Sequence, residues 1–110
     1  MSFNDTYTAA APERAELDTL AGPALVEFGS PTCGHCRAAR EPIAAAMRAH
    51  PGVRHFKIED GRGRPLGRSF GIRLWPTLVF MRDGREVDRL VRPREVAPIA
   101  AALAAIDADP

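Results

Sequence analysis

The two cysteines of the chain lie close together in the motif Cys33-Gly34-His35-Cys36. A pair at this spacing can cycle between a dithiol and a disulfide, or it can supply two ligands of a zinc site. The loop that such a disulfide closes is very short, and a disulfide stabilises a fold less the shorter the loop that it closes. We therefore expect the pair to carry out chemistry rather than to hold the fold together.

The segments on either side of the motif favour redox chemistry. The apolar run at 24–28 predicts a short buried strand, and residues 37–50 predict a helix directly after the motif. A thiol at this turn lies at the positive end of the helix dipole, beside backbone N–H groups that have no helical partner. Both features favour the thiolate, which is the nucleophile in disulfide exchange. The sequence therefore predicts a redox-active dithiol at a strand-to-helix turn.

The remaining elements predict an α/β fold around this turn. Residues 1–10 are polar, and we expect them to be flexible or to form one short edge strand near 6–8. A strand–helix–strand unit requires a parallel pair of strands, whereas Asp83-Gly84 is typical of a hairpin turn. The pattern predicts these elements: a helix at 12–21, a strand at 24–29, a helix at 34–49, a strand at 53–59, a helical turn at 66–70, strands at 77–81 and 86–91, and a helix at 95–106. Together they predict a central mixed sheet with helices on both faces.

Length and composition are those of one globular domain. The chain has 110 residues, of which 45% are hydrophobic and 26% charged, and we expect a single domain over 1–110. A net charge of +1 gives no reason to expect nucleic acid or an anionic membrane as a partner. The N-terminus lacks the basic start and apolar stretch of a secretory signal, and no apolar run is long enough to span a bilayer. These features predict a cytoplasmic protein whose dithiol is reduced and catalytic, and we expect a monomer.

A family resemblance rests on three segments: LVEFGSPTCGHC, GIRLWPTLVF and RDGRE. Their order and spacing are similar to those of the thioredoxin family, and the match covers nearly the whole chain. The Cys-Gly-His-Cys form of the motif is typical of protein disulfide isomerases. The resemblance implies a thioredoxin-like α/β fold, with a central mixed sheet of four to five strands flanked by helices on both faces. It also implies a thiol–disulfide oxidoreductase without a cofactor.

The resemblance implies different roles for the two cysteines. Cys33 is the attacking thiol, exposed at the start of the helix, and Cys36 is the resolving thiol one turn further on. The pair would cycle through a Cys33–Cys36 disulfide while it reduces or exchanges disulfides of proteins or peptides. A partly cationic imidazole at His35 would stabilise the thiolate and make this disulfide more oxidising. We expect a thioredoxin reductase or glutathione to supply the electrons.

Glu27 interrupts an otherwise apolar strand. An exposed edge residue is one interpretation of this pattern. The resemblance instead implies a buried acid behind Cys36 that accepts its proton in the resolving step. A basic partner would accompany the acid, and two candidates stay open. Lys57 is favoured by the ungapped spacing to Pro76, and His55 is favoured if the strand is registered by its apolar positions.

Pro76 is implied to be a cis-proline that faces the dithiol. The backbone beside such a proline can pair with an extended substrate peptide. The chain departs from the family at Gly29 and Thr32, where most thioredoxins carry tryptophan. Trp75 would supply apolar surface from the other side. We expect four residues to form the substrate-binding surface: Thr32, Gly34, Trp75 and Thr77.

Two other functions compete with this interpretation. The dithiol, His50 and His55 have the spacing of zinc-finger ligands, but Pro51-Gly52 breaks the helix that would have to carry both histidines. We therefore expect no metal site. The second alternative is a thioredoxin-like module that binds partners with little redox turnover. Within the enzymatic interpretation, the missing export signal favours a reductase, whereas the Cys-Gly-His-Cys motif favours an isomerase or oxidase.

Overall fold

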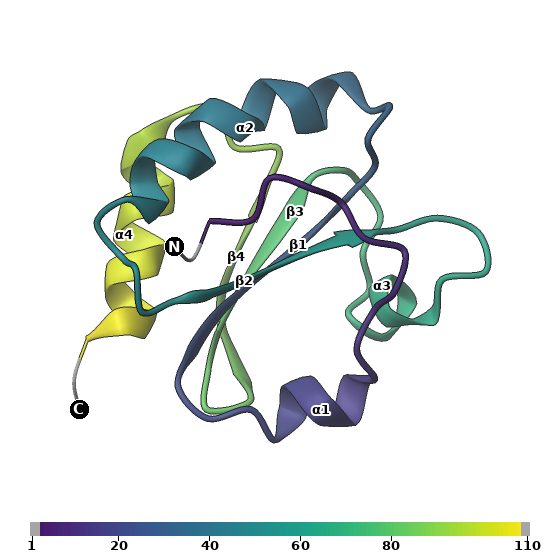
Figure 1. The fold of residues 1–110 in the computed structure, drawn as a ribbon, viewed down its shortest axis with the longest axis horizontal. Coiled ribbons are helices and arrows are strands. Elements are labelled where there is room, and N and C mark those ends of the chain that lie inside the picture. The colour runs from purple at the N-terminus through teal and green to yellow at the C-terminus, as the bar shows by residue number, and fades with distance from the viewer. Residues whose placement is uncertain (1–2, 109–110) are drawn as a thin grey trace.

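The computed structural model describes residues 3–108 of the chain. Figure 1 shows how helices and strands alternate. The elements are α1 (Arg14–Asp18), β1 (Pro23–Gly29), α2 (Gly34–Met47), β2 (Arg54–Glu59), α3 (Pro65–Ser69), β3 (Thr77–Arg82), β4 (Arg85–Val91) and α4 (Val96–Asp107). All predicted helices and strands after position 10 are present, and α1 is shorter than predicted. Within the described residues, no helix combines the length and the apolar character needed to cross a membrane.

The strands form one mixed sheet in the order β2-β1-β3-β4. β1 and β2 are parallel and are joined through α2, whereas β3 is antiparallel to both β1 and β4. The predicted hairpin turn joins β3 and β4. Its two residues, Asp83 (φ 51°) and Gly84 (φ 79°), both have the left-handed backbone that a two-residue hairpin requires. The sheet agrees with the expected mixed sheet of four to five strands.

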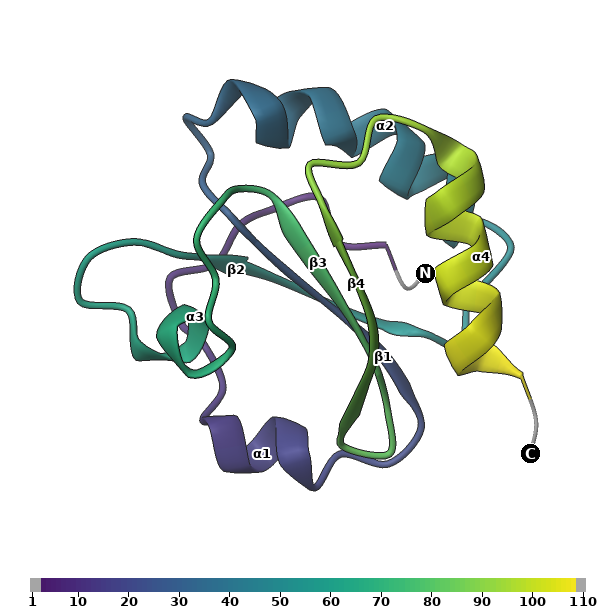
Figure 2. The same cartoon turned by 180° about the vertical axis from the view of Figure 1, so that it is seen from behind.

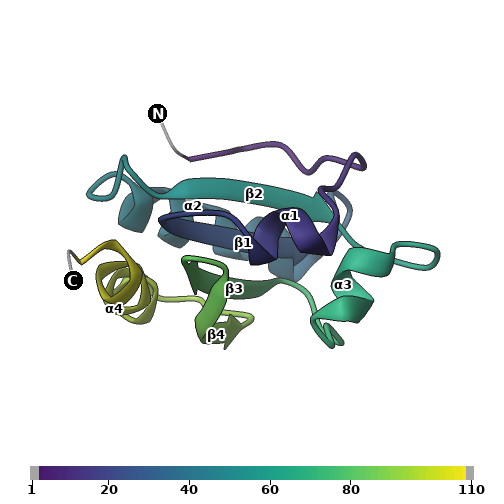
Figure 3. The same cartoon turned by 90° about the horizontal axis from the view of Figure 1, so that it is seen from below.

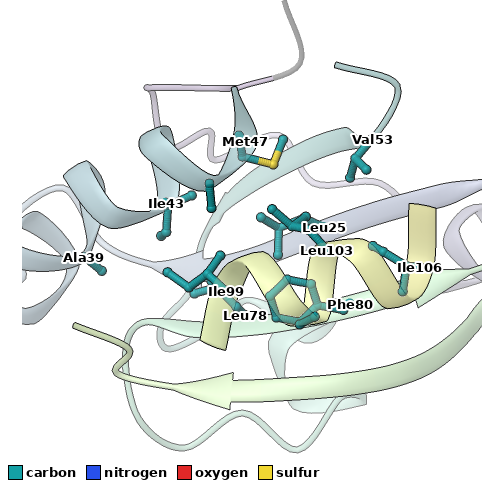
Figure 4. Packing of buried hydrophobic residues seen from close by; sticks show 12 residues of the cluster. Leu25, Ala39, Ile43, Met47, Val53, Leu78, Phe80, Ile99, Leu103 and Ile106 are labelled. Atoms are coloured by element: carbon teal, nitrogen blue, oxygen red, sulfur yellow. The ribbon is translucent and has the colours of Figure 1, made fainter. Parts of the chain in front are cut away.

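Helices cover both faces of the sheet, with α2 and α4 on one face and α1 and α3 on the other (Figures 1, 2 and 3). Each face has its own apolar core, because successive side chains of a strand point to opposite faces. On β1, Leu25 packs in the α2–α4 core, and Val26 and Phe28 pack in the α1–α3 core. Figure 4 shows the α2–α4 core around Phe80. Glu27 lies on the same face as Leu25, so its carboxyl group points beneath α2.

The N-terminal segment, residues 3–10, lies along the free edge of β2. The expected edge strand is reduced to one parallel bridge between Thr8 and Ile58. The Thr8 N–H donates to the Lys57 carbonyl, and the Glu59 N–H donates to the Thr8 carbonyl, both at 2.9 Å. Figures 1 and 3 show the purple trace of this segment beside β2. The bridge therefore holds the polar N-terminal residues next to β2, the strand that carries both candidate basic partners of Glu27, His55 and Lys57.

Candidate active site

The dithiol lies where β1 passes into α2. The helix begins at Gly34, and Cys33 is its N-cap residue with an extended backbone (φ −87°, ψ 122°). The Cys33 Sγ accepts a hydrogen bond from the Cys36 backbone N–H, at 3.3 Å. Donors at a helix N-terminus favour an anion in this position. Cys33 is half-buried and Cys36 is only 2% exposed, so Cys33 is the more accessible sulfur of the pair.

The Cys36 thiol holds its proton firmly. Burial is the main cause that raises its pKa to about 11, and the hydrogen bond with Cys33 adds to the shift. Hydrogen bonds from the Ser30 backbone and from Tyr7 oppose the shift. Because each pKa unit is a factor of ten, roughly one Cys36 in 10,000 is a thiolate at neutral pH. A resolving thiol in this state needs a proton acceptor close by.

Glu27 is fully buried on β1, and two donors bind its carboxylate. The Tyr7 hydroxyl donates to Oε2 at 2.6 Å, and His55 Nε2 lies 2.9 Å from Oε1. The Asn4 backbone N–H donates to the other ring nitrogen, His55 Nδ1, at 2.8 Å. The ring proton is therefore on Nε2, and His55 donates to Glu27 as a neutral imidazole. Both carboxylate oxygens are thus hydrogen-bonded inside the fold.

Of the two candidate partners of Glu27, the structure pairs His55 and not Lys57 with the carboxylate. Lys57 is the register neighbour of Glu27 on β2. Its Nζ nevertheless donates to the Asp5 carbonyl at 3.3 Å and lies 4.6 Å from the centre of the Tyr7 ring. The N-terminal segment therefore binds the ammonium group. His55, on the same face of β2, takes the place beside the carboxylate.

Tyr7 is a site residue that sequence reasoning missed. Its hydroxyl donates to Glu27 Oε2, and both the hydroxyl and the Cys36 sulfur border the space above Gly29, close enough for each group to shift the pKa of the other. The space that it occupies exists because Gly29 has no side chain. A Cβ on Gly29 would lie 2.6 Å from the Cys36 Sγ and would also collide with the Tyr7 hydroxyl. Gly29 in the sequence could have indicated an open space beside Cys36, but no local pattern predicts that Tyr7 is the residue that fills it.

Pro76 lies at the same end of the sheet as the dithiol. The Trp75–Pro76 peptide bond is cis, and β3 begins directly after it. Thr77 pairs with Phe28 across β1 and β3, one residue before β1 ends. Thr77 itself is 2% exposed, and its hydroxyl donates to the Leu74 carbonyl at 2.6 Å. The structure therefore corrects the prediction for the Thr77 side chain, which braces the proline loop from inside instead of facing a substrate.

Arg92 also belongs to the site, and the sequence did not predict its contacts. It follows β4 with a left-handed backbone (φ 52°), a conformation that favours glycine. Its backbone N–H donates to the Pro76 carbonyl at 2.8 Å, and its Nε donates to the Trp75 carbonyl at 2.9 Å. The Trp75 indole N–H donates to Asp60 Oδ2 at 2.9 Å. The loop of Trp75 and Pro76 is thus held by side chains from two sides.

Comparison with known proteins decides what kind of site this is. The model of the thioredoxin family matches residues 9–105. The chain belongs to the thioredoxin family. Members of this family are thiol–disulfide oxidoreductases, and the mixed sheet with its flanking helices is the thioredoxin-like fold.

Three relatives illustrate the range of this thioredoxin-family match. Reduced thioredoxin 2 from Pseudomonas aeruginosa PAO1 is similar in structure, with 54% identity and a TM-score of 0.83 over 94% of this chain and 96% of that one. Protein disulfide-isomerase A2 from Pongo abelii is 39% identical over 82 residues, which are 69% of this chain but only 16% of that protein. Thioredoxin Asp f 28 from Aspergillus fumigatus is 29% identical over 73 residues, 66% of this chain and 68% of that protein.

The loop and first helical turn of this thioredoxin-family site present an exposed surface. Thr32, Gly34 and His35 are exposed around the half-buried Cys33. The Thr32 hydroxyl lies 3.1 Å from the Ser30 hydroxyl, an interaction within the loop. Thr32 gives this surface a polar residue where most members of the family have tryptophan. It leaves the Cys33 sulfur open to an approaching disulfide.

The histidines of the zinc-finger alternative lie apart from the dithiol ligands. His50 Nδ1 is 2.7 Å from Asp107 Oδ2, in the turn after α2, whereas His55 is bound to Glu27 and Asn4. Among residues 3–108, no three histidine, cysteine, aspartate or glutamate side chains gather where they could hold one metal ion. The spacing in the sequence therefore has no counterpart in space.

Proposed function

We propose that the protein reduces or exchanges disulfides of other proteins by cycling Cys33 and Cys36 between dithiol and disulfide. One observation carries the proposal: an accessible sulfur caps α2, with a buried, protonated thiol one turn behind it. The first sulfur is suited to attack and the second to resolve. Family membership supports the same chemistry.

The two steps follow from this geometry. The Cys33 thiolate attacks one sulfur of the substrate disulfide, and the other substrate sulfur leaves as a thiolate. Cys36 then loses its proton and attacks Cys33 Sγ. The new Cys33–Cys36 bond forms as the bond to the substrate breaks, so the substrate gains two electrons and the protein loses two. Glu27 lies in the interior behind Cys36 and is the proposed acceptor of its proton.

We further propose that the protein acts as a cytoplasmic, monomeric reductase, with a thioredoxin reductase or glutathione as electron donor. The isomerase-type Cys-Gly-His-Cys motif supports the opposite direction, since an imidazole at His35 favours the thiolate form. The reduction potential of the dithiol against glutathione separates the two directions. A potential near or below the cytosolic poise supports a reductase, and one well above it supports an oxidant or isomerase.

Insulin reduction tests the core of the proposal. With dithiothreitol or a thioredoxin reductase and NADPH, we expect the wild-type protein to accelerate the precipitation of reduced insulin chains. The Cys33→Ser variant is the control and should be inactive. Binding of disulfide-containing proteins without any turnover would instead support the alternative of a partner-binding module.

A further inference from the structure

The N-terminal segment places Tyr7 over the interior of the site. Thr8 is hydrogen-bonded to β2 through both its backbone N–H and its carbonyl, and the Asn4 N–H donates to His55 Nδ1. The segment is thus anchored on either side of Tyr7. The Tyr7 ring also lies against the Lys57 ammonium group, 4.6 Å from the ring centre. Backbone and ring contacts together fix where the hydroxyl points.

The Tyr7 hydroxyl lies between a proton donor and a proton acceptor. It donates to Glu27 Oε2 at 2.6 Å, a short and strong hydrogen bond. The Cys36 sulfur is its neighbour, because both groups border the space above Gly29 and each shifts the pKa of the other. A phenol can accept one hydrogen bond while it donates another. This arrangement places the phenol where a proton could pass from Cys36 Sγ through it to the buried carboxylate.

We propose that Tyr7 is a catalytic residue that carries the proton of Cys36 to Glu27 in the resolving step. The proposal deepens the proposed function and rests on it. In the mixed disulfide, Cys36 Sγ gives its proton to the Tyr7 oxygen while Tyr7 gives its own hydroxyl proton to Glu27 Oε2. The Cys36 thiolate then bonds to Cys33 Sγ, and the electron pair of the Cys33–substrate bond leaves on the substrate sulfur. Glu27 ends as a neutral acid, and Tyr7 is unchanged.

The two proton movements have to be coupled. Burial, the charge of Glu27 and the hydrogen bonds of the phenol raise the pKa of Tyr7, so a free tyrosinate is not an intermediate. When the protons move together, the hydroxyl of Tyr7 ends by donating to the Cys36 thiolate. The same phenol thus transfers the proton and stabilises the anion that remains.

Other charged groups near the pair do not offer a better acceptor. The ionisable groups that surround Cys36 and Tyr7 are Asp5 in the N-terminal segment, Glu27 on β1, His55 and Lys57 on β2, and Cys33, Arg37 and Arg40 on α2. The carboxylate of Asp5 is held in an exposed ion pair with Arg40 at 2.6 Å. His55 already donates through Nε2 and accepts through Nδ1. Glu27 is the carboxylate in direct contact with the Tyr7 hydroxyl.

Tyr7→Phe tests the relay, since it removes the hydroxyl and keeps the ring. Stopped-flow reaction with 5,5′-dithiobis(2-nitrobenzoate) separates the two steps by release of the coloured thiolate. The first phase is attack by Cys33 and depends on reagent concentration; the second is attack by Cys36 and does not. We expect Tyr7→Phe to leave the first phase unchanged and to slow the second at least about tenfold at neutral pH, because proton transfer by a positioned group contributes about 100- to 10,000-fold.

The pH dependence distinguishes a relay from a structural role. Burial keeps Cys36 protonated at neutral pH, where the relay is needed. At strongly alkaline pH hydroxide removes the thiol proton with or without the phenol, so the difference between wild type and Tyr7→Phe should disappear. A slowdown that stays constant with pH would overturn the relay. A second phase that is unchanged at all pH values would overturn it as well.

Two further variants complete the test. Asp5→Asn is the matched control, because it loosens the same segment from Arg40 without removing the hydroxyl, and its second phase should match wild type. Tyr7→Phe combined with Glu27→Gln should be no slower than the slower single variant, since the two residues act in one path. Independent, multiplying effects would contradict the relay. If wild type itself lacks a second phase, the proposed dithiol cycle fails, and the relay fails with it.

Discussion

Selective alkylation tests quantitatively how far burial suppresses the reactivity of the Cys36 thiol. Iodoacetamide reacts with thiolates, and we expect it to modify Cys33 before Cys36 at neutral pH. The pKa of Cys36 is raised from 9.0 to about 11, mainly by burial. This shift lowers its thiolate population about 100-fold, since each pKa unit is a factor of ten. A more basic thiolate is also a better nucleophile, with a Brønsted coefficient of about 0.4–0.5, which offsets the loss about tenfold.

The net expectation is that Cys36 in the folded protein reacts at least about tenfold more slowly than in the protein unfolded in urea at the same pH. Burial of the sulfur, at 2% exposure, adds to this difference by limiting access. The pH profile is a second signature. The rate for folded Cys36 should rise until about pH 11, whereas the rate for the unfolded chain should level off near pH 9.0.

Peptide mapping after an acid quench measures these rates. Both cysteines fall in one tryptic peptide, residues 15–37, so tandem mass spectrometry has to locate the modification. The reasoning would be refuted if Cys36 were modified first, or if folding did not change its reactivity. Either result would mean that the sulfur is accessible and ionised, and the two roles would then have to be exchanged.

Three other expectations follow from the same site. Cys36→Ser should accumulate mixed disulfides between Cys33 and substrate proteins, visible on non-reducing gels, whereas trapping by Cys33→Ser would reverse the roles. His35→Pro should make the disulfide less oxidising, because it removes an imidazole that favours the thiolate. The reduction potential of the dithiol, measured against glutathione, detects this change, since about 30 mV corresponds to 1.4 kcal/mol. An unchanged potential would show that His35 does not tune the dithiol. Between pH 9.0 and about 11 the unfolded Cys36 thiol ionises before the folded one, so this group's contribution to stability is full below that range and is lost as the pH rises through it. Over this pH range the unfolding temperature of Cys36→Ala should therefore fall less steeply with pH than that of wild type. Equal slopes of unfolding temperature against pH would contradict the shifted pKa.

Features that depend on a few neighbouring residues were predictable from the sequence. The apolar run before the motif, the helix after it and the Asp83-Gly84 turn each follow from local pattern and backbone preference, and the structure contains all three. The accessible position of Cys33 at the cap of α2 follows in the same way, because strand, turn and helix are contiguous. The resemblance to thioredoxins added the depth of Glu27, which is buried as it implies.

Contacts between segments that are far apart in the sequence were decided by the tertiary structure alone. Register places Lys57 next to Glu27, yet the hydrogen bond goes to His55, because the N-terminal segment captures the ammonium group. Tyr7 reaches the site only because Thr8 bridges to β2 and because Gly29 leaves space for the hydroxyl. Hydrogen bonds between residues far apart in the sequence depend on how whole helices and strands pack. The pattern of neighbouring residues does not specify that packing. The sequence therefore predicted that Cys33 lies at the start of the helix and Cys36 one turn further on. Which side chains surround Cys36 depends on how distant segments pack in the tertiary structure.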